Sequence, residues 1–322
     1  MRHWCVRESP NPFLGARGRP IVVGHRGVPA LHQENTLAGF RRAVSLGIPA
    51  VELDVRLTSD RRVVVVHDHN LRRLTGVARK VDDLTWDELT RLRIRRELPM
   101  GRGVHGEEVV VRYEREERIP LLAEVLAEVS GQVAINIELK LDVPMVWQVE
   151  IATRTAQVIA EANAQDRVIV TSFDPRKLLA LRRIQPNVAH GFCFDDSMLD
   201  FASPLLDRLP PFSSELLLPS GRGLRANARR LLNRLLEIDL LGRLLGSRLV
   251  AAEHTLIGRR TVKRLHAKGV AIGTHTLFPL GSAGGKPIAP SAVTEAEVHR
   301  LVEAGVDWIE SDDPERLQRL IS

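Results

Sequence analysis

The chain has 322 residues and a formal net charge of +6, and 44% of its residues are hydrophobic. These values indicate an ordinary globular protein that buries a large core, as one barrel or as two smaller domains. Its two cysteines lie far apart, which argues against a disulfide framework or a thiolate zinc site. The N-terminal residues lack the apolar run of a signal peptide, and no stretch is apolar enough to span a membrane, so we expect a soluble, cytoplasmic protein.

The positive charge is concentrated in one segment. Residues 222–248 contain seven arginines and two acidic residues, a surplus of +5 that leaves about +1 for the rest of the chain. This segment contains no aromatic residue on which a base could stack. We therefore do not expect the protein to bind nucleic acid.

The first elements predict two parallel strands joined by a helix. Residues 1–19 are rich in Pro, Gly and Arg and are expected to form a flexible lead-in. Residues 21–23 should form a short buried strand, and a helix should run over residues 36–46 with Thr36 as its N-cap. Residues 50–57 should form the next strand. A strand, a helix and a strand in this order are typical of a parallel pair.

A hairpin follows the second strand. Only five residues separate that strand from the one predicted at residues 63–67, too few for a crossover helix, so the two should pair antiparallel. Six further strands are predicted, mostly separated by helical patterns, at residues 133–138, 167–171, 188–193, 248–252, 270–275 and 306–310. With the first two they give eight parallel strands, the number in a TIM (β/α)8 barrel. A doubly wound sheet is the alternative fold.

Two segments interrupt the alternation of strands and helices. Residues 56–118 should form a small inserted subdomain after the second barrel strand, with one short helix around residues 85–92. Residues 195–247 begin with a Pro-rich loop and continue into the arginine-rich segment, where leucines form a wide apolar stripe. Both segments are expected to belong to a single barrel domain that covers residues 20–322.

Two carboxylates lie on one face of the second strand. Glu52 and Asp54 are two residues apart, so both side chains project from the same side. Buried like charges need a compensating cation, either a metal or an Arg or Lys partner. Glu138 ends the third barrel strand, and the carboxyl ends of barrel strands meet at one rim, so three carboxylates should converge there. Oxygen ligands without cysteine suit Mg²⁺ or Ca²⁺.

Histidines and basic residues are expected at the same rim. His25 and Arg26 end the first strand, and His67 can fold over the rim from the end of the hairpin strand. Lys140 shares a face with Glu138. This combination suits chemistry on a phosphate. The alternative is that the carboxylates only pair with Arg26 and Lys140 in an ion network.

Several short motifs occur in a fixed order along the chain. They are His25-Arg26-Gly27, Glu34-Asn35-Thr36, Glu52-Leu53-Asp54-Val55, Thr58 followed by Asp60, His67-Asp68, Glu138-Leu139-Lys140 and Ser311-Asp312-Asp313-Pro314. In order and spacing these motifs resemble the glycerophosphodiester phosphodiesterase family. The resemblance is specific over residues 21–75 and good again over 119–140, whereas residues 195–250 show no family signature. It implies a TIM barrel with a small insertion after the second strand.

The resemblance also implies an activity, the metal-dependent hydrolysis of glycerophosphodiesters to sn-glycerol 3-phosphate and an alcohol. Carried over by position, the roles are ligation of a divalent metal, Mg²⁺ or Ca²⁺, for Glu52, Asp54 and Glu138, general acid and base catalysis for His25 and His67, and binding of the substrate phosphate for Arg26 and Lys140. Two alternatives stay open. One is a lysophospholipase D-like activity on lysophospholipids, and the other is a catalytically silent barrel that binds lipid headgroups.

Some positions depart from the family pattern. His275-Thr276 stands where many members have Trp-Thr on the seventh strand, and Trp308 stands where they have Gly in the last strand. Both positions are expected near the substrate mouth, so His275 and Trp308 are candidates for the substrate pocket. Glu253, at another strand end, is a third candidate. These departures leave the preferred alcohol open.

The arginine-rich helix has two interpretations. Its apolar stripe, rimmed by arginines, could place residues 222–246 on an anionic membrane surface as a peripheral contact. The simpler interpretation, which we favour, is that the stripe packs on the barrel or forms a dimer. The sequence leaves the oligomeric state open.

Overall fold

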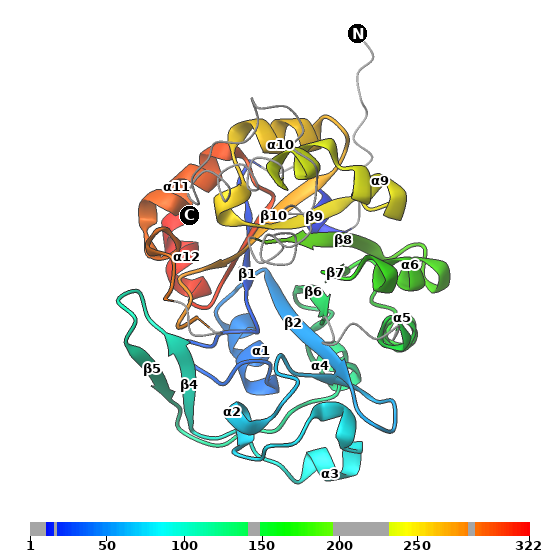
Figure 1. Cartoon of the computed structure of the whole chain (residues 1–322), viewed down its shortest axis with the longest axis vertical. Coiled ribbons are helices and arrows are strands. Elements are labelled where there is room, and N and C mark those ends of the chain that lie inside the picture. Colours follow the sequence, from blue (N-terminus) through cyan, green and yellow to red (C-terminus); the bar gives the residue numbers. More distant parts are fainter. Residues whose placement is uncertain (1–10, 16–17, 141–148, 196–231, 283–286) are drawn as a thin grey trace, which may run out of the picture.

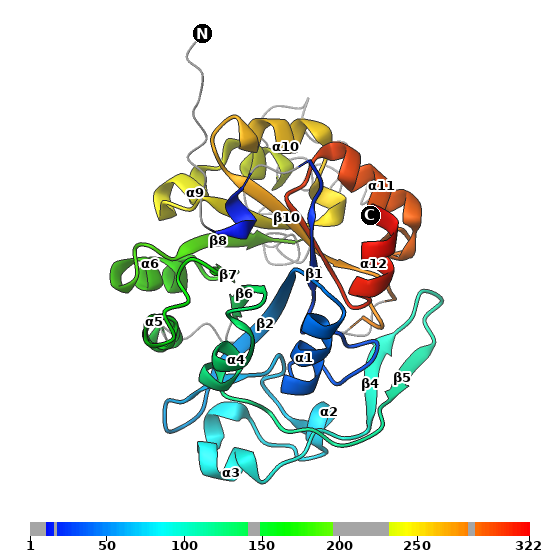
Figure 2. The same cartoon turned by 180° about the vertical axis from the view of Figure 1, so that it is seen from behind.

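Parallel strands form a closed barrel at the centre of the molecule (Figures 1 and 2). The computed structural model describes residues 11–15, 18–140, 149–195, 232–282 and 287–322. Within these ranges the barrel strands are β1 (Ile21–Gly24), β2 (Ala50–Leu57), β6 (Ala134–Leu139), β7 (Val168–Ser172), β8 (Ala189–Phe194), β9 (Leu249–Glu253), β10 (Ala271–Leu277) and β11 (Trp308–Ser311). Neighbours pair parallel, and β1 pairs with both β2 and β11, which closes the sheet. The predicted TIM barrel is confirmed, and the open doubly wound sheet is wrong.

Helices surround the barrel and connect most of its strands (Figure 1). Thr36 caps the first of them as predicted, because its hydroxyl accepts a hydrogen bond from the Gly39 N–H at 3.2 Å. The helices are α1 (Leu37–Ser45), α4 (Leu122–Val129), α5 (Glu150–Glu161), α6 (Pro175–Ile184), α9 (Leu240–Leu245), α10 (Arg259–His266), α11 (Glu295–Ala304) and α12 (Pro314–Ile321). Short 3-10 helices lie at Pro12–Leu14, Val81–Asp83, His254–Leu256 and Pro290–Val293.

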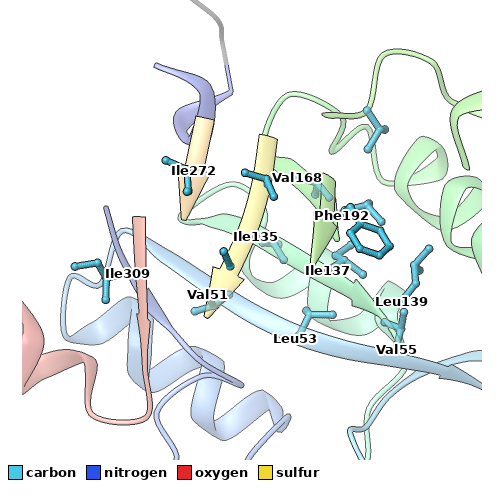
Figure 3. Packing of buried hydrophobic residues seen from close by; sticks show 14 of the residues in the cluster. Val51, Leu53, Val55, Ile135, Ile137, Leu139, Val168, Phe192, Ile272 and Ile309 are labelled. Atoms are coloured by element: carbon cyan, nitrogen blue, oxygen red, sulfur yellow. The ribbon is translucent and has the colours of Figure 1, made fainter. Parts of the chain in front are cut away.

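Successive strand residues face two different environments. Val51, Leu53 and Val55 of β2 belong to the large apolar cluster that also contains the buried faces of the helices (Figure 3). The alternate residues face the barrel interior. Near the amino ends of the strands these interior residues are apolar, whereas toward the carboxyl ends they include Glu52 and Asp54. The alternation therefore places polar side chains inside one end of the barrel, where TIM barrels carry their active sites.

Phe13 closes the amino end of the barrel. Its side chain is fully buried, and its ring meets the edge of Trp308 with the ring centroids 5.5 Å apart. The Asn11 side chain holds this segment by donating a hydrogen bond to the Val168 carbonyl at 2.8 Å. Residues 11–15 thus differ from the flexible lead-in expected there, because a large aromatic side chain anchors them in the core.

Trp308 fills the barrel interior and does not lie at the substrate mouth. It is the first residue of β11 and is fully buried. Gly273 on the neighbouring strand leaves the space for the indole ring, since a Cβ at that position would lie 1.7 Å from Cε2 of Trp308. The expectation that Trp308 lines the substrate pocket is therefore corrected. A residue at the start of a barrel strand lies at the end opposite to the active site.

The inserted segment packs against a core of its own. It contains β3 (Val63–Val65), α2 (Arg72–Thr75), α3 (Trp86–Thr90), β4 (Glu97–Arg102) and β5 (Glu108–Arg112). β3 pairs antiparallel with β2, as predicted, and Thr85 caps α3, the short helix expected around residues 85–92. The β4–β5 hairpin was not predicted, because Pro99 and Gly101 interrupt β4 and shift its register. Buried side chains of this segment form a third apolar cluster that includes Leu71, Leu74, Leu89 and Leu98.

Part of the leucine-rich segment packs on the barrel. Residues 196–231 lie outside the described part of the chain, while 232–238 are helical and α9 follows. Leu232, Leu236 and Leu245 are buried in the large apolar cluster, which agrees with the favoured interpretation of the stripe. Four other apolar side chains of this segment are exposed, namely Leu235, Ile238, Leu240 and Leu244. In the residues that the structure describes, no helix is both long and apolar enough to cross a bilayer.

Candidate active site

His25 is oriented by a carboxylate at the end of the last strand. Its Nδ1 lies 2.6 Å from Oδ1 of Asp312, whose Oδ2 accepts a hydrogen bond from the Leu280 N–H at 2.9 Å. The other ring nitrogen, Nε2, lies 3.8 Å from Oε2 of Glu52. With Nδ1 engaged by Asp312, Nε2 is the nitrogen that faces the carboxylates of β2.

Arg26 lies in a left-handed turn that brings both its backbone and its side chain to these carboxylates. Its φ angle is 57°, a conformation that costs a non-glycine residue of the order of 1 kcal/mol. The Arg26 N–H donates to Oε2 of Glu52 at 3.0 Å. The guanidinium contacts Asp54 with Nε at 3.1 Å and donates from Nη1 to Glu34 at 3.0 Å. Asn35, from the same loop, also contacts Asp54, because its side-chain amide donates to Oδ2 at 2.8 Å.

Three carboxylates meet at the rim as the sequence predicts. Glu52 and Asp54 come from β2, and Glu138 stands opposite Asp54 in the register of β6 with β2. One oxygen atom from each of the three lies within 4.8 Å of the others. Lys140 contacts two of them, with Nζ 3.2 Å from Asp54 and 2.8 Å from Glu138.

The environment acts differently on the two carboxylates of β2. Burial raises the pKa of Glu52 well above its usual range, and the nearby negative charge of Asp54 raises it further. Burial acts in the same direction on Asp54, but the positive charges of Lys140 and Arg26 outweigh it and hold the pKa of Asp54 well below its usual range. Nearby positive charge therefore compensates the two carboxylates unequally, and Glu52 is the less compensated of them.

One carboxylate oxygen of Glu52 has no hydrogen-bond partner among the described residues and is suited to bind a metal. Its Oε1 is buried without a hydrogen-bond partner, although burial of such an atom costs about 1–3 kcal/mol. The side chains of Lys140 and Arg26 pair with three carboxylates, Asp54, Glu138 and Glu34, and neither forms an ion pair with Glu52. The ion network considered above is thus present but leaves excess negative charge. A hard divalent cation is the group that this set of oxygens suits.

His67 reaches the same rim from the insertion. Its Nδ1 lies 2.9 Å from Oδ1 of Asp68, and Arg73 in turn donates to Oδ2 of Asp68 at 2.7 Å. Burial lowers the pKa of His67, and the positive charges of Arg26 and Lys140 lower it further. The neutral ring is therefore favoured near pH 7.

Two adjoining cavities share His25, Arg26, His67 and Thr276. The inner cavity, about 230 Å³ in volume, lies inside the barrel mouth, and its wall includes Glu138, Asn136, Thr171, Phe173, His275 and Glu310. The outer cleft, about 480 Å³, lies between the barrel rim and the insertion, and its wall includes Arg73, Pro99, Met100, Arg102, Glu108, Pro279 and Asp312. The histidines and Arg26 thus stand where the two spaces meet.

The comparisons with known proteins agree with this geometry. The sequence model of the glycerophosphoryl diester phosphodiesterase family matches residues 25–316. The chain belongs to this family. It is 31% identical over 183 residues to a glycerophosphodiester phosphodiesterase of Caldanaerobacter subterraneus, an alignment that covers 56% of this chain and 70% of that protein. It is also 39% identical over 120 residues to a lysophospholipase D of Mus musculus, covering 37% of this chain and 36% of that protein.

Solved structures of glycerophosphodiester phosphodiesterases share the fold. One from Silicibacter pomeroyi superimposes with a TM-score of 0.68 at 21% identity, covering 96% of this chain and 95% of that one. A phosphodiesterase of Oleispira antarctica, solved with its product sn-glycerol 3-phosphate, gives a TM-score of 0.63 at 21% identity, covering 94% of this chain and 97% of that one. Family membership makes the chain a phosphoric diester hydrolase.

The predicted pocket residues of this phosphodiesterase lie in three different places. His275 lines the inner cavity, where its ring stands 6.2 Å from that of Phe173 and burial lowers its pKa to about 4. Glu253 lies beside His275 in the strand register but is not among the residues that line either cavity. Trp308, as described above, is buried in the interior of the barrel.

Several residues of the site carried no role in the sequence interpretation. They are Asp312, which holds His25, Arg73, which holds Asp68, and the inner-cavity residues Asn136, Thr171 and Glu310. A period of two places Asn136 beside Glu138 on the inward face of β6, so that signal was available. Arg73 has no comparable signal, because the insertion that brings it to the rim has no regular periodicity.

Proposed function

We propose that this enzyme hydrolyses glycerophosphodiesters to sn-glycerol 3-phosphate and an alcohol, with a divalent metal and two histidines. The observation that carries the proposal is the meeting of His25, His67 and Arg26, which line both cavities, with the three clustered carboxylates of the barrel rim. The substrate class comes from the names of the relatives, including the structure solved with sn-glycerol 3-phosphate.

Glu52, Asp54 and Glu138 are the proposed ligands of the metal, which we expect to be Mg²⁺ or Ca²⁺. Their oxygens lie close enough together to share one ion, and Oε1 of Glu52 is buried without a partner. Neither sulfur nor imidazole belongs to this set, which favours a hard cation. When bound, such an ion would neutralise the negative charge that grows on the phosphate oxygens during hydrolysis.

The two histidines are proposed to transfer protons on either side of the phosphate. His67 would accept a proton from the attacking water, since its lowered pKa favours the neutral ring. His25 would donate one to the departing alkoxide, since Asp312, 2.6 Å from Nδ1, orients the ring so that Nε2 faces the site. A positioned acid or base typically contributes a factor of about 10² to 10⁴ to the rate.

Arg26 and Lys140 are proposed to bind the phosphate. Both remain fully protonated, because neighbouring carboxylates raise the pKa of each above its usual range despite the opposing effect of burial. Arg26 lines both cavities and stands next to His25, so a phosphate between the histidines would contact its guanidinium. The fixed positive charge also limits the repulsion between the carboxylates and an anionic substrate.

Release of glycerol 3-phosphate from glycerophosphocholine tests the activity. We expect turnover with Mg²⁺ or Ca²⁺ and its loss in EDTA. Unchanged turnover in EDTA would contradict the metal role, and a lack of turnover on all glycerophosphodiesters and lysophospholipids would leave only a catalytically silent barrel.

A lysophospholipase D-like activity is the second candidate. The match to the mouse lysophospholipase D favours it, and so do the apolar residues Pro99, Met100 and Pro279 in the outer cleft. The exposed side chains Leu240 and Leu244 could rest on an anionic membrane, where the cytoplasmic enzyme that we expect would meet such substrates. Absence of binding to anionic vesicles at low salt, measured by co-sedimentation, would contradict this membrane contact.

A further inference from the structure

Glu310 is a fourth acidic residue in the barrel mouth, and the reaction proposed above does not use it. It is 3% exposed, lies on the inward face of β11 and lines the inner cavity. Its Oε1 accepts hydrogen bonds from the Asn136 amide at 2.9 Å and from the Trp308 indole at 3.3 Å. The carboxyl group is therefore held in one orientation.

The partners of Glu310 are themselves fixed. Asn136 can donate to Glu310 only in one orientation of its amide, and the Thr171 hydroxyl selects that orientation by donating to Asn136 Oδ1 at 2.9 Å. Trp308 is fully buried and cannot turn away. Both donors act on Oε1, and among the described residues no hydrogen bond reaches Oε2. This second oxygen is thus left for a group inside the cavity.

The size of the inner cavity limits that group. The cavity has a volume of about 230 Å³, and the barrel core containing Phe13 and Trp308 lies behind it. It has room for a three-carbon polyol. The outer cleft is larger, about 480 Å³, and suits the variable alcohol. A phosphate at His25 and Arg26 would then direct its glycerol inward.

Charge excludes a second phosphate from the floor of the cavity. Glu310 and Glu138 both line it, and burial raises the pKa of Glu310 to about 7, so above that pH an anion there is repelled, whereas a hydroxyl can donate to a carboxylate oxygen. A buried site built to hydrogen-bond a hydroxyl strongly disfavours ligands that lack it, because the polar group of the protein is then left unpaired.

We propose that Glu310 binds the terminal hydroxyl of the glycerol moiety through Oε2 and selects substrates in which this hydroxyl is free. The inference rests on the proposed function for the identity of the ligand. It predicts that the enzyme favours glycerophosphodiesters over 1-acyl lysophospholipids, whose acyl ester occupies that hydroxyl.

The experiment compares two ligands on the full-length protein. Calorimetry with Mg²⁺ and, in parallel, with EDTA would give the dissociation constants of sn-glycerol 3-phosphate and of 2-hydroxypropyl phosphate, which lacks the terminal hydroxyl. Burial raises the pKa of Glu310 to about 7, so the comparison is made at about pH 8.5, where the carboxyl group is ionised. There we expect wild type to prefer the first ligand by about tenfold, the effect of one hydrogen bond to a charged group. In Glu310→Gln the cavity-side group is an NH₂, which cannot accept the hydroxyl proton and can only donate to the hydroxyl oxygen. A neutral hydrogen bond is about half as strong as one to a charged group, so the preference should fall more than twofold, by our estimate.

The ratio of the two constants separates this role from a merely structural or electrostatic one. Removal of a negative charge changes the affinity for both phosphates equally and leaves the ratio unaltered. Glu303→Gln is the matched control, because it makes the same chemical change on α11, where Glu303 forms an exposed ion pair with Arg259 of α10, and it should keep the wild-type ratio.

Two outcomes would overturn the role of Glu310. One is a wild-type preference below about twofold, and the other is a Glu310→Gln preference within about twofold of wild type. If Glu310→Gln does not fold, as judged by circular dichroism, the wild-type comparison still decides the hydroxyl contact. Turnover of glycerophosphocholine by wild type tests the proposed function separately, so a protein that shows the binding preference without turnover contradicts only the activity.

Discussion

Arg73 donates hydrogen bonds to both carboxylate oxygens of Glu34, from Nη1 to Oε2 and from Nη2 to Oε1, each at 2.8 Å. Arg73 belongs to α2 of the insertion, whereas Glu34 lies in the loop before α1 of the barrel. The same guanidinium holds Asp68, which holds His67. A single side chain therefore fixes the part of the insertion that carries His67 against the barrel loop that holds Arg26.

Replacement of Arg73 should weaken the contact between the His67 segment of the insertion and the barrel. Lysine keeps the charge but cannot form the paired bonds, so we expect Arg73→Lys to lose about tenfold in kcat/KM and Arg73→Met to lose more. A purely structural role would lower only stability. We expect the acid limb of the pH profile to move as well, because Asp68 would no longer be held against His67. Wild-type kcat/KM in both variants would contradict the positioning role.

Glu52→Gln tests the metal site without an activity assay. It removes a buried charge that has no partner on one oxygen, so the metal-free protein should keep or gain thermal stability. The rise in Tm that Mg²⁺ or Ca²⁺ gives the wild type should disappear, because binding to the native state alone produces it. An undiminished rise in the variant would contradict ligation by Glu52. Glu303→Gln should behave as wild type in both conditions.

The pH dependence should report the lowered pKa of His67. The neutral ring accepts the proton, so kcat/KM should fall only when the pH drops through a value below the usual 6.5. The hydrogen bond that the His67 ring donates to Asp68 acts in the opposite direction and raises this pKa, so Asp68→Asn should move the acid limb to still lower pH. An acid limb that stays in place or moves upward in this variant would be evidence against His67 as the base.

Removal of either histidine should abolish most of the activity. We expect His25→Ala and His67→Ala each to lose about 10² to 10⁴ in kcat with unchanged circular dichroism. His69 is the matched control, since it pairs with Asp82 in the insertion and lines neither cavity. Near-normal rates in either catalytic variant would assign the proton transfer elsewhere.

Phe13 should contribute to stability and not to catalysis. Truncation to alanine opens a cavity against Trp308 inside the barrel, so we expect Phe13→Ala to lower the free energy of unfolding by about 3–5 kcal/mol. Leu244→Ala, at a side chain that is 67% exposed, should change it by less than about 0.5 kcal/mol. Denaturation in urea measures both. Equal effects of the two substitutions would mean that residues 11–15 do not hold the barrel closed.

The sequence alone determined the barrel and the residues that meet at its rim, because local rules govern both. The two-residue period of a strand predicts which side of the sheet each side chain faces. The order of strands and helices, with short connections, predicts parallel strands whose carboxyl ends lie at one rim. These rules brought Glu52, Asp54 and Glu138 together, and they placed His25 and Arg26 beside them.

Only the tertiary structure decided what surrounds these residues. The depth of Trp308 depends on the room that Gly273 leaves, the role of Glu310 depends on Asn136 from a distant strand, and Arg73 joins two segments that share no pattern. Such contacts arise between residues far apart in the chain, where no periodicity relates one side chain to the other. Alternation predicts on which face a side chain lies, whereas three-dimensional packing determines what it touches there.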